Sequence, residues 1–230
     1  WRALESLLTM QMKLKKTGLR PEERIEDGIN CSVPIATPGF FEMVADGRIK
    51  ELWIMATSPV DSLPDADGVA AALKACPFVV VSEVSRAASS LKFADVVLPA
   101  AAWGEKDGTV TNSERRISRQ RPFLPLPGEA RPDWQIIAGV GARMGWGEAF
   151  AYEAPHQIFD EYARLSGIGN DGTRDFDISG MAGLDRAGYD RLAPFQWPRP
   201  PGGRHSETRF FGAGGFYHAD RRGRLVAVRQ

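Results

Sequence analysis

Residues 94–121 read ADVVLPAAAWGEKDGTVTNSERRISRQR, and this stretch indicates the fold of the chain. Its first half contains a short apolar, β-branched strand closed by Pro99, which is typical of a strand buried on both faces of a sheet. The polar run that follows has neither a helical nor a strand period, so we expect a loop. It carries two candidate anion-binding groups, Lys106 and the pair Arg115 and Arg116. A buried strand that leads into such a loop is where an α/β protein usually binds its ligand.

Two further apolar runs, at residues 49–56 and 78–81, precede this stretch. Helical patterns at residues 64–76 and 85–93 connect the three predicted strands, which implies parallel pairing with right-handed crossovers. We therefore predict an α/β fold with a parallel, three-layer, Rossmann-like segment. Three strands make a small sheet, so we expect neighbouring strands to come from outside this chain.

The patterns along the chain predict four parts. Residues 1–47 are a helical lead-in, residues 48–150 the α/β segment, residues 151–200 a helical and irregular connector, and residues 201–230 the start of a β-rich domain. Helices are predicted at residues 133–144 and 155–166, and Asp185 is expected to cap a short helix. Alternation around GAGG predicts a hairpin within residues 208–228.

The composition excludes several classes of protein. Lys plus Arg equals Asp plus Glu, at 29 each, which argues against a nucleic-acid-binding protein. No apolar run reaches 18 residues, so we expect no membrane span. Cys31 and Cys76 show neither a disulfide framework nor a metal-ligand spacing, and Cys76 falls on the apolar face of a predicted helix. The chain begins at Trp1 without an initiator Met, so we expect residues to be missing before it.

Polar side chains occur after all three predicted strands. Ser58 follows the first, Ser82 and Glu83 end the second, and Lys106 lies beyond the third. Hydroxyl groups suit phosphate or ribose, a carboxylate suits the donor edge of guanine or a ribose hydroxyl, and a lysine neutralises phosphate. We therefore predict a nucleotide site at this edge of the sheet, although each residue alone also fits an ordinary polar strand end. Asp133 opens a predicted helix, whose dipole stabilises a carboxylate without any ligand.

Other polar residues leave alternatives open or suggest no chemistry. Arg115 and Arg116 are simply solvated, bind phosphate, or join an internal salt-bridge network, and the sequence leaves these alternatives open. The histidines, His156, His205 and His218, have no carboxylate or nucleophile at a diagnostic spacing, so we assign them no catalytic role. No Ser–His–Asp order, Walker loop or GxGxxG motif is present.

Several stretches together resemble the molybdopterin oxidoreductases. They are WIMATSPV (residues 53–60), VVVSEVS (79–85), the stretch at 94–121, and PGEARPDWQIIAGVGARMGW (127–146). The later stretch IFDEYARLSGIGNDGTRDFDISG (158–180) is similar to the assimilatory nitrate reductases of that family. The resemblance covers roughly residues 45–230, and it implies that residues 48–150 are a molybdopterin-dinucleotide-binding segment.

The resemblance implies a bis(molybdopterin guanine dinucleotide) molybdenum cofactor. Its contacts in this chain would be Ser58, Ser82, Glu83, Lys106 and Asp133. Family members commonly have Asn where Ser58 stands and often have Asp where Glu83 stands. The side chains at both positions therefore differ in length from those of the family, and so does the distance over which each can contact the cofactor. Neither cysteine resembles an iron–sulfur or molybdenum ligand of the family, so we expect no metal ligand and no catalytic residue in this chain. A [4Fe–4S] cluster is expected in a missing N-terminal part.

The function implied by the resemblance is that of part of the catalytic subunit of a molybdenum-dependent nitrate reductase, inactive as this chain alone. A formate dehydrogenase or another molybdopterin oxyanion reductase remains the alternative within the family, and a non-catalytic nucleotide-binding module the alternative outside it. The implied partners are the remaining parts of the polypeptide and an electron-donor protein or reductase subunit. The implied location is the cytoplasm.

Overall fold

The computed structural model describes residues 38–170, 174–203, 209–212, 214–216, 218–223 and 225. These residues divide into two compact units. Unit 1 comprises residues 38–108 and 120–157, and unit 2 comprises residues 109–119 and the described residues from 158 onward. This division cuts across the predicted segments, because residues 109–119 group with the C-terminal part of the chain. The expectations for Cys31 and for the lead-in before residue 38 lie outside the described residues.

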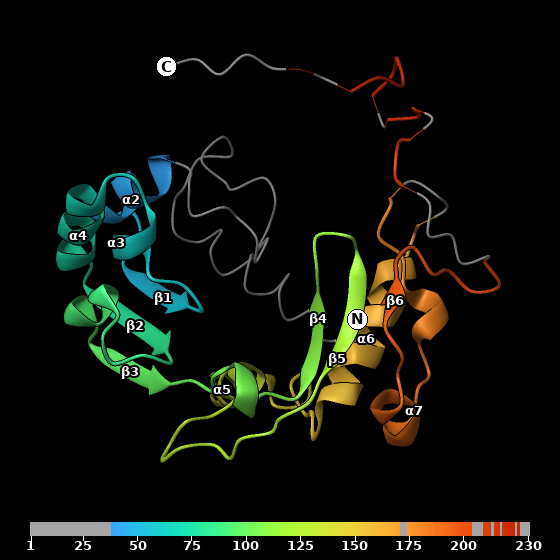
Figure 1. Cartoon of the computed structure of the whole chain (residues 1–230). Coiled ribbons are helices and arrows are strands. Elements are labelled where there is room, and N and C mark those ends of the chain that lie inside the picture. The colour runs from blue at the N-terminus through green and yellow to red at the C-terminus, as the bar shows by residue number, and fades with distance from the viewer. Residues whose placement is uncertain are drawn as a thin grey trace. The chain divides into compact units, whose positions relative to one another are not determined.

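Unit 1 contains a parallel sheet of three strands in the order β1-β2-β3 (Figure 1). The strands are β1 (Glu51–Met55), β2 (Phe78–Glu83) and β3 (Val96–Pro99). Ile54 pairs with Val81, and Val81 pairs with Val97, so these side chains share one face of the sheet. The α/β fold and the parallel order predicted from the apolar runs are therefore confirmed.

Helices α2 (Pro38–Ala45), α3 (Pro59–Ser62) and α4 (Ala66–Ala75) lie beside this sheet (Figure 1). The Asp65 carboxylate accepts a hydrogen bond of 3.0 Å from the Gly68 amide, which fixes the start of α4. The 3₁₀ helix η3 (Ser89–Phe93) connects β2 to β3. The helices and strands enclose one apolar core, whose buried members are Val44, Ile54, Val69, Ala72, Leu73, Cys76, Val79 and Val81. Cys76 is thus a small buried hydrophobe, as predicted.

Strand β3 corrects the expectation of a strand buried on both faces. Val96 is 37% exposed and Val97 is 49% exposed, although adjacent residues of a strand point to opposite faces. β3 is the last strand of the sheet order, and beyond it the described residues provide one parallel bridge, from Ala100 to Arg131. An apolar run predicts a strand, but whether that strand is buried depends on which other segments pack against it, and the run does not specify them.

The chain after β3 forms the 3₁₀ turn η4 (Trp103–Glu105) and, after a Pro-rich connection, helix α5 (Asp133–Gly141). A π-helical turn, η5 (Ala142–Trp146), continues α5, so the helix predicted at residues 133–144 is present with a changed final turn. Gly145 has φ = 93° near the end of this turn, a conformation that favours glycine.

Unit 2 corrects the expectation of a loop after Lys106. Strands β4 (Gly108–Thr111) and β5 (Arg116–Gln120) occupy this region, and β6 (Phe195–Gln196) pairs antiparallel with β5. The Asn112 side-chain oxygen accepts hydrogen bonds from the Glu114 and Arg116 amides, at 3.1 and 2.9 Å, and so holds the turn between β4 and β5.

The two helices predicted after residue 150 are present, as α6 (Pro155–Gly167) and α7 (Arg186–Asp190). The 3₁₀ turn η6 (Ser179–Met181) was not predicted. Asp185 caps α7 by accepting a hydrogen bond of 2.7 Å from the Gly188 amide, as predicted. The core of this unit is formed by Ile117, Phe159, Ala163, Ile178, Tyr189 and Phe195.

The hairpin predicted within residues 208–228 is not formed by the described residues of that stretch. They form turns, one of which is closed by a hydrogen bond of 2.8 Å from the Arg221 amide to the His218 carbonyl. Within the part of the chain that the structure describes, no helix has both the length and the apolar character that a bilayer crossing requires.

Candidate functional site

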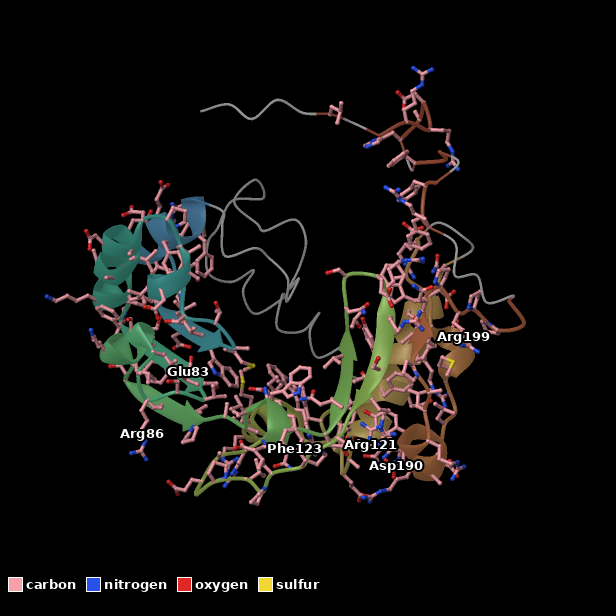
Figure 2. All side chains as sticks on the ribbon, viewed as in Figure 1. Glu83, Arg86, Arg121, Phe123, Asp190 and Arg199 are labelled. Carbon is pink, nitrogen blue, oxygen red and sulfur yellow. The ribbon has the colours of Figure 1, made fainter. Side chains whose placement is uncertain are left out.

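A cavity of about 320 Å³ lies at the carboxyl ends of the three parallel strands of unit 1. Its lining includes all the residues singled out from the sequence, which are Ser58, Ser82, Glu83, Lys106 and Asp133. The rest of the lining is Ala56, Thr57, Val84, Ala100, Ala101, Ala102 and Trp103. Figure 2 labels Glu83 where β2 ends. The structure therefore brings the candidate residues together, while their role as cofactor contacts stays a prediction.

The local structure explains why these residues meet. Ser58 precedes α3, and Ser82 and Glu83 are the last residues of β2. Lys106 directly follows η4, and Asp133 is the first residue of α5. Parallel strands end at the same edge of a sheet, so the segments that leave them converge there.

The Ser58 hydroxyl is held by two neighbours. It donates to the Asp61 carboxylate at 2.5 Å and lies 2.9 Å from the Ser90 hydroxyl. The Asp61 carboxylate also accepts from the Ser89 amide at 3.2 Å. The hydrogen bond from Ser58, followed by those from Ser89, lowers the pKa of Asp61 below its usual range. The cavity wall beside α3 is thereby linked to η3.

We expect the Asp61→Asn variant to lose part of the pH dependence of stability. A carboxyl group whose pKa is lower in the folded state stabilises the fold above its unfolded pKa, near 3.9. That contribution disappears as the pH falls through the folded pKa. Thermal unfolding midpoints of both proteins, measured from pH 6 to pH 3, should therefore converge toward the acid end. A difference that stays constant with pH would contradict this role of Asp61.

Ser82 and Glu83 are positioned by groups on the sheet itself. The buried Ser82 hydroxyl accepts a hydrogen bond of 2.8 Å from the Trp53 indole N–H. The Glu83 oxygen Oε1 accepts from the backbone amides of Val84 and Ser85, at 2.8 and 3.0 Å. These bonds leave the Ser82 hydroxyl proton and the second Glu83 carboxylate oxygen as groups that a ligand in the cavity can use.

Lys106 and Asp133 form an ion pair across the cavity wall. The Lys106 Nζ donates to the Asp133 Oδ2 at 2.6 Å, and the two side chains are 29% and 26% exposed. An ammonium group has three N–H donors, so two remain for a ligand after this bond. The pair is only partly shielded from water, which limits what it contributes to stability without a ligand.

This set of groups fits a nucleotide. The Lys106 ammonium and the serine hydroxyls are donors for phosphate and ribose oxygens, and the Glu83 carboxylate is an acceptor for a base. Alanines line much of the remaining wall, and such small side chains let a ligand approach the backbone closely. The volume is near the lower end for ligand pockets, so the cavity suits part of a dinucleotide.

Arg115 and Arg116 do not line this cavity and belong to unit 2. The Arg115 guanidinium donates to the Trp197 carbonyl at 2.6 Å and stacks 3.8 Å from the centre of the Phe210 ring. The Arg116 guanidinium forms an ion pair of 2.6 Å with Glu114, and this hydrogen bond lowers the Glu114 pKa. Arg116 therefore forms an internal salt bridge, one of the alternatives that the sequence left open, while Arg115 binds a carbonyl and an aromatic ring.

The sequence reasoning missed Trp103, whose indole lines the cavity and is 64% exposed. A signal was available, because Trp103 is a large aromatic residue between a run of alanines and the Gly-Glu-Lys segment that contains Lys106. The exposure of a side chain cannot be read from such a run, so the sequence alone does not mark Trp103 as a cavity residue.

A second cavity, of about 390 Å³, lies between β3 and α5 and contains none of the candidate residues. Its lining combines apolar groups such as Leu98 and Ile136 with charged groups, including Arg143. The smaller cavity is the better site, because donors and acceptors converge in it. Among the described residues, no group of three His, Cys, Asp or Glu side chains is arranged to hold a metal ion.

Comparisons with known proteins agree with this fold. Residues 14–143 match the family model described as molybdopterin oxidoreductase. A nitrate reductase from Klebsiella oxytoca is 53% identical over 167 residues, which are 70% of this chain and 19% of that protein. The alpha subunit of F420-dependent formate dehydrogenase 2 from Methanococcus maripaludis is 37% identical over 183 residues, 76% of this chain and 25% of that protein.

A solved structure shows the same fold at low sequence identity. Acetylene hydratase from Pelobacter acetylenicus superimposes with a TM-score of 0.55 and 17% identity, over 79% of this chain and 23% of that chain. The chain spans about a fifth to a quarter of the length of the curated relatives described above. Because the family model matches more than half of its 230 residues, the chain belongs to the molybdopterin oxidoreductase family.

Proposed function

We propose that this chain is part of the catalytic subunit of a molybdenum-dependent nitrate reductase, which reduces nitrate to nitrite. Its cavity would hold the guanine dinucleotide portion of a bis(molybdopterin guanine dinucleotide) cofactor. The observation that carries this proposal is the convergence of Ser58, Ser82, Glu83, Lys106 and Asp133 in one cavity at the strand ends. When bound, the cofactor supplies the redox chemistry, and residues of this chain bind and orient it.

The proposed contacts follow from the chemistry of each group. Lys106, held by Asp133, donates to a phosphate or to an acceptor on the pterin side of the cofactor. The hydroxyl groups of Ser58 and Ser82 contact ribose or phosphate oxygens. The Glu83 oxygen that is not bonded to the backbone accepts from the N1–H and exocyclic amine of guanine.

Other parts of the activity are proposed to reside outside this chain. Because the chain spans about a fifth to a quarter of its relatives' length, we place the [4Fe–4S] cluster and the substrate pocket in other parts of a longer polypeptide. An electron-donor protein or reductase subunit would deliver electrons, and the complete enzyme would work in the cytoplasm. This chain alone is then expected to be inactive.

Formate oxidation is the second candidate, because a formate dehydrogenase subunit is 37% identical over 183 residues. The test is to purify the protein with all the sequence its gene encodes and measure molybdenum, released guanine nucleotide and both activities. Nitrate reduction with bound molybdenum and guanine nucleotide would support the main proposal. Formate oxidation would favour the second candidate, and a protein without molybdenum or nucleotide would favour a non-catalytic module.

We expect Glu83→Gln to weaken retention of the guanine nucleotide more than the small change in shape suggests. The backbone amides of Val84 and Ser85 would select the oxygen of the new amide, as they now select Oε1. The NH₂ group of Gln would then face the donor edge of guanine, and two donors would oppose each other. Release of guanine nucleotide in increasing urea measures the effect.

Glu51→Gln is the matched control, because Glu51 is exposed at the opposite end of the sheet, where β1 begins. It should release nucleotide at the same urea concentration as the unchanged protein. Equal release from the Glu83→Gln protein would remove Glu83 from the set of guanine contacts.

A further inference from the structure

We infer that the Trp103 indole is the surface on which the guanine base stacks in this cavity. The inference rests on the proposed function. It assigns a base-binding role to a residue that is not among the five polar candidate residues of the cavity. Trp103 lines the same cavity as Glu83 and Lys106, and its side chain is 64% exposed. An indole in that position can cover one face of a planar base while the carboxylate binds the base's edge.

The backbone beneath Trp103 is held firmly although the side chain is open to solvent. The Trp103 carbonyl accepts from the Gln120 side-chain amide at 2.7 Å. The Glu105 carboxylate accepts from the Ala102 amide at 2.7 Å and closes the turn from the other side. An indole side chain has only two rotatable bonds, so it loses little conformational entropy when a ligand stacks on it, which favours binding.

The next residue, Gly104, prevents this turn from shifting. Its carbonyl accepts from the Phe123 and Leu124 amides at 2.8 and 3.0 Å. A Cβ atom added at Gly104 would lie 2.8 Å from the Phe123 ring, closer than such atoms approach. The chain is therefore packed tightly behind Trp103, and the indole is left on the cavity side.

The surrounding wall makes Trp103 the natural stacking surface. The neighbouring lining residues of the same segment are Ala100, Ala101 and Ala102, whose methyl groups cannot cover a base. Single exposed apolar residues are common on protein surfaces, so exposure alone would mean little. What distinguishes Trp103 is that it shares one small cavity with a carboxylate and an ammonium group.

The test uses the full-length protein purified from cells that cannot make molybdopterin, with GDP as the probe. We expect Trp103→Leu to weaken GDP binding by about 5- to 150-fold, the range for losing one base-stacking contact. Trp103→Phe, which keeps an aromatic face, should bind GDP within about threefold of the unchanged protein. Phe78→Leu is the control, because Phe78 is an exposed aromatic residue at the start of β2 and does not line the cavity.

A second measurement does not depend on any variant. Oxidative footprinting of the unchanged protein should show Trp103 protected by GDP, and Phe78 not. Absence of protection, no measurable GDP binding, or equal GDP affinity of the Trp103→Leu protein would overturn the inference. Protection by 6-hydroxymethylpterin rather than by GDP would also overturn it, because the stacked ring would then be the pterin. The molybdenum and nucleotide content of the holoenzyme decides the proposed function separately.

Discussion

Lys106→Ala is expected to produce an enzyme that retains little molybdenum cofactor. The ammonium group lies 2.6 Å from Asp133 and has two further donors for the cofactor, so the variant loses a charge-assisted hydrogen bond. The expected loss is about 1.5–3 kcal/mol of binding free energy, roughly a tenfold to hundredfold change in affinity. The variant also leaves the Asp133 carboxylate facing the phosphates without its cation. Metal analysis after gel filtration measures the effect.

Two comparisons make this result specific to the site. Lys74→Ala removes an exposed lysine from the last turn of α4, away from the cavity lining, and should leave the molybdenum content unchanged. Adding Asp133→Asn to the Lys106→Ala protein removes the uncompensated carboxylate, so it should restore part of the lost content. Normal molybdenum content in the Lys106→Ala protein would exclude Lys106 from cofactor binding.

The second large effect concerns the 230-residue chain expressed by itself, which should aggregate or bind dyes that report exposed apolar surface. Val96 and Val97 leave both faces of the edge strand β3 open among the described residues. Open, apolar edge strands pair with other chains. Light scattering and dye fluorescence, compared across protein concentrations, measure this behaviour.

The Val97→Lys variant tests the cause of that aggregation. A lysine on an edge strand opposes pairing with other strands, so this variant should remain soluble at higher concentration. Ile168→Lys is the matched control, because Ile168 is also a partly exposed apolar residue but lies outside every strand. A soluble monomer with one sharp unfolding transition in the unchanged chain would contradict the prediction.

The parallel sheet and the grouping of the candidate residues were predictable because both follow from local patterns. Apolar runs separated by helical patterns predict parallel strands, and parallel strands bring Ser58, Glu83 and Lys106 to one edge. The hairpin of β4 and β5 was missed because its strands are short and polar. Ile117 of β5 pairs with Phe195, a partner far along the chain, and no local pattern identifies such a pairing.

The exposure of Trp103 was not predictable from the sequence for a related reason. An apolar run gives the type of element, whereas burial depends on which other segments cover it. The polar character of Arg115 and Arg116 likewise suggested a phosphate site. Their binding to Trp197, Phe210 and Glu114 depends on tertiary neighbours that the spacing does not reveal.

The ion pair between Lys106 and Asp133 also has a consequence for the order of events during protein synthesis. Asp133 leaves the ribosome 27 residues after Lys106, and the chain between them includes the hairpin assigned to unit 2. At ~5–20 residues per second, the ribosome takes roughly 1–5 s to add that interval. The lysine therefore emerges before its counter-ion does, and the cavity lacks one wall throughout that time. Cofactor insertion into a complete site can begin only after translation has passed the start of α5.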